Sequence, residues 1–168
     1  MKSFVLLVVY ILVFCVPEKT QAQDEWQVGV GAALVRLIDK NAFNNEQHLF
    51  QIPRLNVTKK INEKFSMNGA ISFNSIQITE IVDNGVNYFS IDTSLRYSLM
   101  KNVNFIDPYT FVGASLVNIQ LNISPAINFG VGNTFWVFKN LGINTQVMYK
   151  LSFELNASHF QFTTGLVY

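Results

Sequence analysis

Cysteine is nearly absent from this sequence, and charged residues are scarce. Cys15 is the single cysteine, so no disulfide can form within the chain. Asp, Glu, Lys and Arg make up only 14% of the residues, against about 25% in typical soluble domains. This share is too small to cover the whole surface of a 168-residue protein with well-hydrated side chains. Part of the surface is therefore predicted to face something other than water.

Long apolar runs are also missing, apart from one near the start. The run Phe4–Val16 follows Lys2 and precedes Thr20-Gln21-Ala22. A basic start, an apolar segment of about 7–15 residues and a small-residue cleavage site are typical of a secretory signal peptide. A transmembrane helix needs about 20 apolar residues. We predict a signal peptide at 1–22, cleaved after its last residue, and one domain at 23–168; an uncleaved N-terminal anchor is the alternative.

The cysteine lies inside this apolar run. A lipoprotein signal needs a small residue just before its cysteine, and Phe14 occupies that position, which argues against lipidation. Removing the predicted signal peptide leaves ten basic and ten acidic residues. Such a balance lacks the basic footprint of a nucleic-acid-binding protein.

Beyond the signal peptide the dominant period is two, which indicates β-strands. One face of each segment is apolar, and the other carries Ser, Asn, Gln, Gly, Thr and a few charges. The eight segments are Trp26–Leu34, Pro53–Thr58, Phe65–Asn74, Phe89–Ser98, Tyr109–Val117, Ile127–Phe135, Ile143–Leu151 and Phe160–Tyr168. In the fifth segment the phase is ambiguous, because Phe111 and Val112 both suit the apolar face.

The connections between these segments alternate in length. The short ones are rich in lysine and comprise Asn62-Glu63-Lys64, Lys101–Phe105 and Lys139-Asn140. The longer ones are Asp39–His48, Thr79–Asn87, Asn118–Pro125 and Phe153–Ser158. Short periplasmic turns and longer outer loops are typical of outer-membrane barrels, in which the number of strands is even. Any recognition is expected in the longer loops.

The chemistry of the polar face distinguishes a barrel in lipid from a barrel in water. A soluble barrel has a charged exterior, whereas this polar face is almost uncharged and suits a hydrogen-bonded interior. Lipid offers the backbone no partners, so a sheet that spans it must be closed. We therefore predict an all-β fold, an eight-stranded antiparallel up-and-down transmembrane β-barrel. A secreted soluble barrel that carries an apolar ligand, as lipocalins do, is the alternative.

Aromatic residues fall near the ends of the predicted strands. Girdles of aromatic side chains mark the two membrane surfaces of such barrels. The residues expected in these girdles are Trp26, Tyr97, Tyr109, Trp136, Tyr149 and Tyr168.

Several short motifs resemble a known family. Phe160–Tyr168 looks like the terminal strand of an outer-membrane barrel, in which apolar residues alternate up to a final aromatic. The end of the signal, Thr20–Gln23, together with Pro53–Val57 and Asp107-Pro108-Tyr109 before Val112-Gly113, resembles the small outer-membrane β-barrels common in Bacteroidetes. That family is similar to the OmpA and OmpX type of transmembrane barrel. The resemblance implies that the barrel-assembly machinery reads the terminal strand and that no catalytic residue is present.

Four charged residues are expected to face the lumen: Arg54, Asp92, Arg96 and Lys150. An isolated buried charge is very costly, so these residues should be paired. A paired cluster would form a polar plug that closes the bore; a narrow, selective ion path is the alternative.

Other candidate chemistry is weaker. Ser158-His159 with Glu154 suggests a lipid-modifying hydrolase, but adjacent strand residues point to opposite faces, while a nucleophile and its base must be in hydrogen-bond reach. His48 and His159 lack the surrounding ligand spacing of a metal site. The longer loops carry an excess of acidic residues, which suggests either divalent cations that bridge lipopolysaccharide or a plain solvated rim. The loop charges are Asp39, Glu46, Glu80, Asp83 and Glu154 against Lys40.

The sequence thus predicts a non-enzymatic, monomeric outer-membrane barrel that acts in envelope integrity or in surface contacts through its loops. No residue is assigned a catalytic, cofactor-binding or metal-binding role. The expected partners are outer-membrane lipid, lipopolysaccharide and the barrel-assembly machinery.

Overall fold

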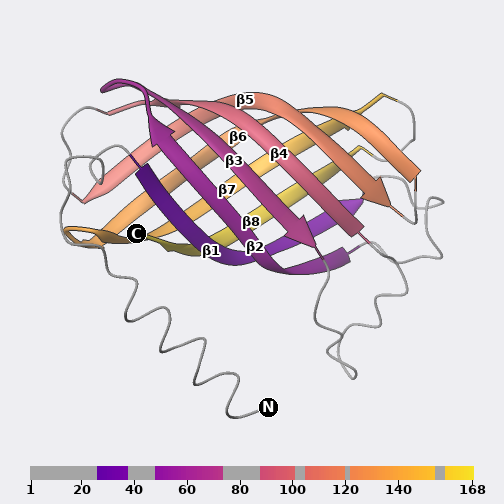
Figure 1. Ribbon diagram of the computed structural model, residues 1–168, viewed down its shortest axis with the longest axis horizontal. Helices are drawn as coiled ribbons and strands as arrows, with labels where there is room; N and C mark the ends of the chain where they lie inside the picture. The colour runs from indigo at the N-terminus through magenta and orange to yellow at the C-terminus, as the bar shows by residue number, and fades with distance from the viewer. Residues whose placement is uncertain (1–25, 38–47, 74–87, 101–104, 120–121, 154–157) are drawn as a thin grey trace, which may run out of the picture.

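The computed structural model describes residues 26–37, 48–73, 88–100, 105–119, 122–153 and 158–168. These residues form one sheet of eight antiparallel strands (Figure 1). The strands are β1 (Trp26–Leu37), β2 (His48–Lys60), β3 (Phe65–Phe73), β4 (Tyr88–Ser98), β5 (Ile106–Ile119), β6 (Asn122–Phe138), β7 (Leu141–Ser152) and β8 (His159–Val167). The predicted signal peptide lies outside the described residues, and no helix within them is long and apolar enough to cross a membrane.

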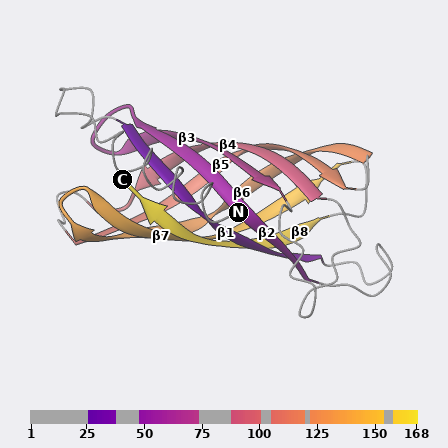
Figure 2. The same cartoon turned by 60° about the horizontal axis from the view of Figure 1, so that its bottom comes forward.

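The sheet closes on itself. Every strand pairs with its neighbours in the sequence, and β1 also pairs with β8 from Gly29↔Val167 to Leu37↔His159. Figure 2 shows these two strands side by side. Backbone bonds of 2.9 Å and 2.8 Å between Val28 and Tyr168 extend the seam beyond β8. The predicted eight-stranded, antiparallel, up-and-down barrel is confirmed.

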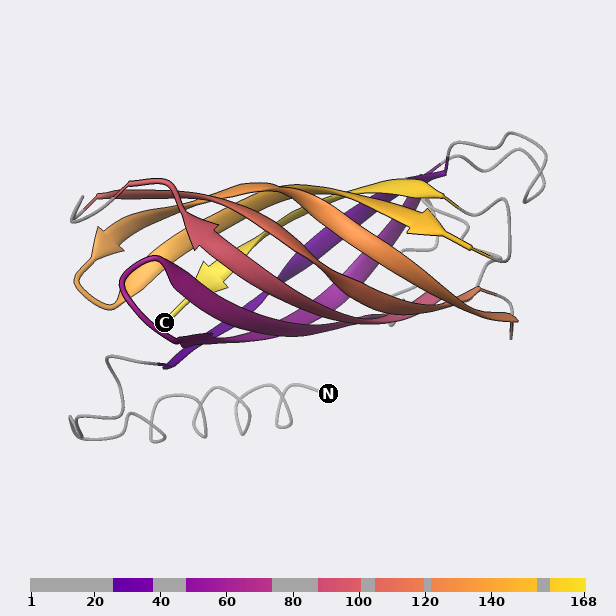
Figure 3. The same ribbon diagram turned by 90° about the horizontal axis from the view of Figure 1, so that it is seen from above.

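The two ends of the barrel differ in their connections. We call the end at which β1 begins and β8 finishes the terminus end, and the opposite one the far end. Figure 3 shows the C-terminus at the same end as the β2–β3 and β6–β7 turns. The first of these turns is held by Asn62, whose Oδ1 accepts hydrogen bonds from the backbone N–H groups of Lys64 and Phe65 at 2.9 Å and 2.8 Å. The short turns predicted at 62–64 and 139–140 therefore lie together at one end.

One predicted long loop is wrong. Asn118–Pro125 does not form a loop, because β5 continues to Ile119 and β6 begins at Asn122, and these two residues pair directly. Asn, Ser and Pro favour loops locally, but the alternation continues through them: Ser124 is buried and Ile123 is exposed. Proline has no backbone N–H to donate to a neighbouring strand. Pro125 is tolerated because pairing of β6 with β7 begins only at the next residue, Ala126. Its carbonyl accepts a hydrogen bond from the backbone N–H of Phe153.

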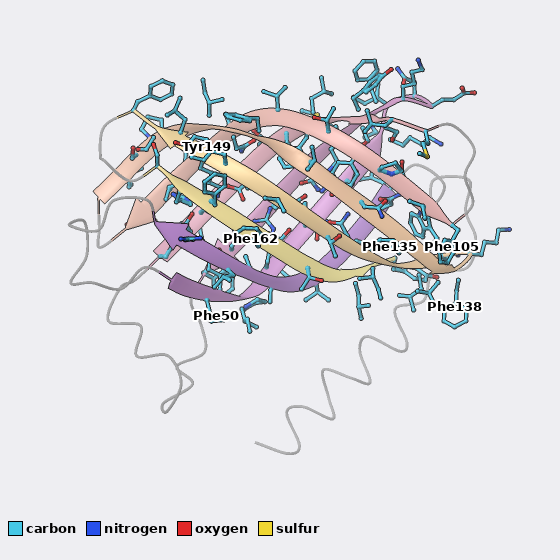
Figure 4. All side chains as sticks on the ribbon, turned by 180° about the vertical axis from the view of Figure 1, so that it is seen from behind. Phe50, Phe105, Phe135, Phe138, Tyr149 and Phe162 are labelled. Carbon is cyan, nitrogen blue, oxygen red and sulfur yellow. The ribbon has the colours of Figure 1, made fainter. Side chains whose placement is uncertain are left out.

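The predicted polarity of the barrel is confirmed. Large apolar side chains project outward around the whole barrel, as the rings labelled in Figure 4 illustrate. Val131 on β6 is 58% exposed, and Ile91, Phe129 and Phe162 are exposed as well. The buried side chains are mostly polar and include Gln51, Ser72, Ser90, Asn128, Gln146 and Gln161. An oily exterior around a hydrophilic interior is the reverse of a soluble barrel.

The structure resolves the phase of β5. Tyr109 and Phe111 face the interior, and Val112 and Leu116 face outward. Tyr109 lies opposite Gly132 on β6, and Phe111 lies opposite Gly130. A Cβ at Gly132 would overlap Cζ of the Tyr109 ring, so the glycine leaves room for this ring inside the bore. Tyr109 is 3% exposed and was wrongly expected in a girdle; the small residues opposite it decide its direction.

The remaining girdle residues divide between the two faces. Trp26 and Tyr168 are exposed at the terminus end, as predicted, and the Lys59 ammonium lies 5.1 Å from the centre of the Trp26 ring. Tyr97 packs against the exposed Phe65 ring at 5.2 Å. Trp136 differs, because it lines a cavity inside the barrel, where Gly142 leaves room beside its ring.

Tyr149 lies in an aromatic row on the outer face. Its ring centre is 5.6 Å from that of Phe129 and 5.0 Å from that of Phe160. Both are its direct cross-strand partners, on β6 and β8. Cross-strand aromatic pairs of this kind contribute about 0.2–1 kcal/mol each relative to alanine pairs. The row therefore reinforces the register of three adjacent strands.

Replacing Gly132 with alanine is expected to destabilise the barrel by about 1–3 kcal/mol, because the new methyl group overpacks the interior against Tyr109. The measurement is urea unfolding of the protein in lipid vesicles. Gly69→Ala is the matched control: a Cβ there meets no atom within 4 Å, so the change should be neutral or stabilise by about 0.4–1 kcal/mol. Equal effects of the two substitutions would contradict the inward placement of Tyr109.

Candidate functional site

A cluster of three charged side chains crosses the interior toward the far end. Asp92 on β4 accepts a hydrogen bond from Arg54 on β2 at 2.8 Å and from Lys150 on β7 at 2.6 Å. All three residues occupy inward positions of their strands and are almost fully buried. The sequence predicted that these residues face the lumen and are paired, and both points are confirmed. We call these three residues the Asp92 cluster.

Hydroxyl groups accept further hydrogen bonds from the two cations. Arg54 Nη1 donates to Ser72 Oγ at 2.6 Å, and Lys150 Nζ donates to Ser90 Oγ at 3.2 Å. Lys150 also lies 3.5 Å from the Tyr88 hydroxyl, and its own exposure is 0%. A buried ion pair is tolerated only when its remaining donors are satisfied in this way. The cluster therefore has the properties of a structural plug.

The layer nearer the far end is filled by further polar side chains and by Val35. The Tyr88 hydroxyl and His159 Nε2 are 2.9 Å apart, and Gln161 Nε2 donates to Gln51 Oε1 at 3.0 Å. Val35 is fully buried in β1. Together with the Asp92 cluster, these side chains fill the bore from several strands.

Arg96 lies closer to the terminus end and has a different environment. Its Nη1 and Nη2 donate to Thr58 Oγ1 and Gln146 Oε1, both at 3.3 Å. Its guanidinium lies 4.6 Å from the centre of the Tyr109 ring, a cation–π contact. Within the described part of the chain, no carboxylate lies at ion-pairing distance from it. The prediction that every lumen charge is paired with an opposite charge is therefore wrong for Arg96.

Tyr109 connects Arg96 to further neutral groups. The Tyr109 hydroxyl donates to Gln146 Oε1 at 3.1 Å, and Asn144 Nδ2 donates to the hydroxyl oxygen at 2.8 Å. Asn144 also donates to Thr134 Oγ1 at 2.9 Å. Sequence reasoning missed the role of Tyr109, although the inward glycines of the next segment were a signal that large rings fit opposite them.

A cavity of about 250 Å³ lies between this layer and the terminus end. Polar and apolar residues both line it. The polar lining residues include Thr58, Lys60, Arg96, Asp107 and Thr134, and the apolar ones include Phe65, Met100, Ile106 and Trp136. The barrel interior is therefore filled through the Asp92 cluster and hollow at the terminus end.

The proposed hydrolase residues do not share a described hydrogen bond. Ser158 Oγ accepts from the backbone N–H of Ser152 at 3.2 Å, and the His159 ring contacts Tyr88 inside the barrel. Glu154 lies outside the described residues, as do the acidic loop residues Asp39, Glu46, Glu80 and Asp83 with Lys40. The backbone of His48 begins β2, and its side chain is not described. Among the described residues, no group of three potential metal ligands is present.

Comparisons with known proteins identify the fold. No protein-family model and no curated protein matches the sequence significantly. The outer-membrane protein OprG of Pseudomonas aeruginosa matches with a TM-score of 0.63 at 12% identity, covering 86% of this chain and 94% of that one. The N-terminal β-barrel domain of P. aeruginosa OprF gives 0.60 at 11% identity, covering 84% and 95%.

A third match comes from another organism. Ail, the attachment invasion locus protein of Yersinia pestis, gives a TM-score of 0.59 at 15% identity, covering 86% of this chain and 97% of that one. At these identities the likeness concerns the fold. The chain has the fold of the small eight-stranded barrels that these bacterial outer-membrane proteins adopt.

Replacing Asp92 with asparagine is expected to destabilise the barrel by about 3–5 kcal/mol, because Arg54 and Lys150 would remain buried without a counter-charge. Urea unfolding in vesicles measures the loss. The same substitution at Asp107, which is only partly buried and has no described ion pair, should cost at most about 1 kcal/mol.

A combined variant separates charge from packing. Arg54→Met, Asp92→Leu and Lys150→Met together remove all three charges at similar volume and should recover most of the stability lost in Asp92→Asn. A triple variant as unstable as Asp92→Asn would show that the cluster does not act through charge pairing.

Proposed function

We propose that this protein is a non-enzymatic, monomeric barrel that spans the bacterial outer membrane and contributes to envelope integrity or to surface contacts through its far-end loops. The observation that carries the proposal is the apolar band on the outside of a closed sheet. Each strand has at least nine residues, and a tilted strand of about 9–11 residues is long enough to cross a bilayer. Closure leaves no strand edge unpaired in lipid.

The side chains at the terminus end fit a membrane surface. Trp26, Tyr97 and Tyr168 combine apolar rings with polar atoms, and such residues gather where lipid meets water. Lys59 and Lys64 reach over the Trp26 and Tyr97 rings at 5.1 Å and 5.6 Å. This end would lie in the periplasm, after export by the signal peptide at 1–22.

The filled interior supports a structural rather than a transport role. Among the described residues, the Asp92 cluster and the layer beside it occupy the bore with hydrogen-bonded side chains, which supports a closed bore. An apolar ligand, as a soluble carrier would bind, finds no apolar cavity at the centre, where the side chains are polar. The proposed role therefore resides on the outer surface and in the loops.

Partners and family follow from the same proposal. Outer-membrane lipid and lipopolysaccharide would contact the apolar band and the far end, and the barrel-assembly machinery would read the strand that ends at Tyr168. The motifs at Pro53–Val57 and Asp107-Pro108-Tyr109 support assignment to the small-barrel family common in Bacteroidetes.

Replacing Val131 with arginine tests whether the outer face meets lipid. Val131 is 58% exposed near the middle of β6, so a charge there should reduce stability in vesicles by about 2–4 kcal/mol. Phe138→Arg is the matched control, because Phe138 is 68% exposed at the terminus end of the same strand, where the cost should be about 0–1 kcal/mol.

Cell fractionation provides a second readout of the same proposal. The wild-type chain should be recovered in the outer-membrane fraction and should migrate differently on a gel before and after heating. Recovery as a soluble periplasmic protein, with Val131→Arg as stable as the wild type in water, would overturn the membrane proposal.

A further inference from the structure

Arg96 is a buried cation that the described residues hydrogen-bond only incompletely. It is 6% exposed, and both of its described side-chain hydrogen bonds go to neutral oxygens at 3.3 Å. That distance is long for an N–H···O bond, which is commonly about 2.9–3.0 Å. Its Nε–H has no hydrogen-bond partner within the described part of the chain. The contrast with Arg54 is direct, since Arg54 bonds a carboxylate at 2.8 Å.

The cavity at the terminus end adjoins this cation. It extends from Arg96 and Tyr109 to the β2–β3 turn at Asn62. At about 250 Å³ it has room for about eight waters at ~30 Å³ each, and it is smaller than the about 300–1,000 Å³ of drug-sized pockets. An occupant must therefore be small.

We propose that this cavity binds a small organic carboxylate. Its carboxylate group accepts hydrogen bonds from the Arg96 guanidinium and supplies a carboxylate at ion-pairing distance, which no described residue provides. Its apolar part contacts Trp136, Ile106 and Met100, which line the same cavity. An arginine fork matches the two oxygens of a carboxylate, and charge-assisted bonds of this kind are about twice as strong as neutral ones.

The other charges in the cavity wall favour a single negative charge. Lys60, Glu63 and Asp107 contribute to the part nearer the terminus end, at the last residue of β2, in the β2–β3 turn and at the second residue of β5. The two carboxylates repel additional negative charge. Inorganic phosphate carries about −1.5 to −2 at pH 7 and lacks an apolar part. A monocarboxylate is therefore the better fit.

The test is a titration of the full chain, expressed with its own N-terminus and purified from membranes in dodecyl maltoside. The probes are benzoate, neutral benzamide of similar shape, and inorganic phosphate, at constant ionic strength. The readouts are the ¹⁵N–¹H signals of Arg96 Nε and of the Trp136 indole, the latter identified with Trp136→Phe. Benzoate should shift both signals and saturate, while benzamide and phosphate should bind at least about tenfold more weakly.

Variants separate the cation from the cavity. Arg96→Gln should weaken benzoate binding at least about tenfold, as read from the Trp136 signal, and Arg36→Gln, an exposed arginine on β1, should leave it unchanged. Ser66→Trp fills the cavity from β3 and should abolish binding while the Arg96 signal persists. The heat-dependent gel shift reveals whether Arg96→Gln folds. If it does not fold, Ser66→Trp alone tests whether benzoate binds in the cavity.

Three results would overturn the inference: benzoate binding that survives Ser66→Trp, a benzamide affinity equal to that of benzoate, or a phosphate affinity equal to it. Only the route by which a ligand would arrive, from the periplasm, rests on the proposed function. Binding to the purified protein does not depend on the proposed function. Recovery of the protein in the soluble fraction would therefore contradict the membrane proposal without affecting the result of this titration.

Discussion

Closure of the sheet between β1 and β8 is the constraint on which the rest of the structure depends. An open sheet would leave a row of unpaired N–H and C=O groups along each edge, and in lipid no solvent satisfies them. The register from Gly29↔Val167 to Leu37↔His159 removes both edges. Once the backbone is satisfied internally, the outer surface is free to be apolar, and the polar side chains turn toward the axis.

A narrow closed bore then dictates what can lie inside it. Eight strands enclose a space that side chains just fill. Where β6 carries Gly130 and Gly132, the rings of Phe111 and Tyr109 occupy the space opposite. Where long charged side chains meet, one carboxylate holds two cations, Arg54 and Lys150. The small diameter of the bore thus determines both the packing and the charge pairing inside the barrel.

The sequence-based expectations succeeded where alternation is strong and failed where it competes with composition. Asp92 and Lys150 were correctly placed in the lumen, because their flanking residues alternate clearly. Asn118–Pro125 was wrongly expected to be a loop, because Asn, Ser and Pro favour turns locally, whereas pairing with the neighbouring strand extends β5 and β6 through them. Tyr109 was wrongly placed in a girdle, because its direction depends on glycines in another strand.

Period-two polarity, read along the chain, determined by itself that this protein is an all-β barrel with an apolar outside, because successive side chains of a regular strand point to opposite faces. Which charges meet was decided by the tertiary structure alone. Arg54 and Arg96 are both inward-facing arginines, yet one lies beside Asp92 and the other beside Thr58 and Gln146. The stagger between strands sets the height of each residue in the bore, and no single strand carries that information.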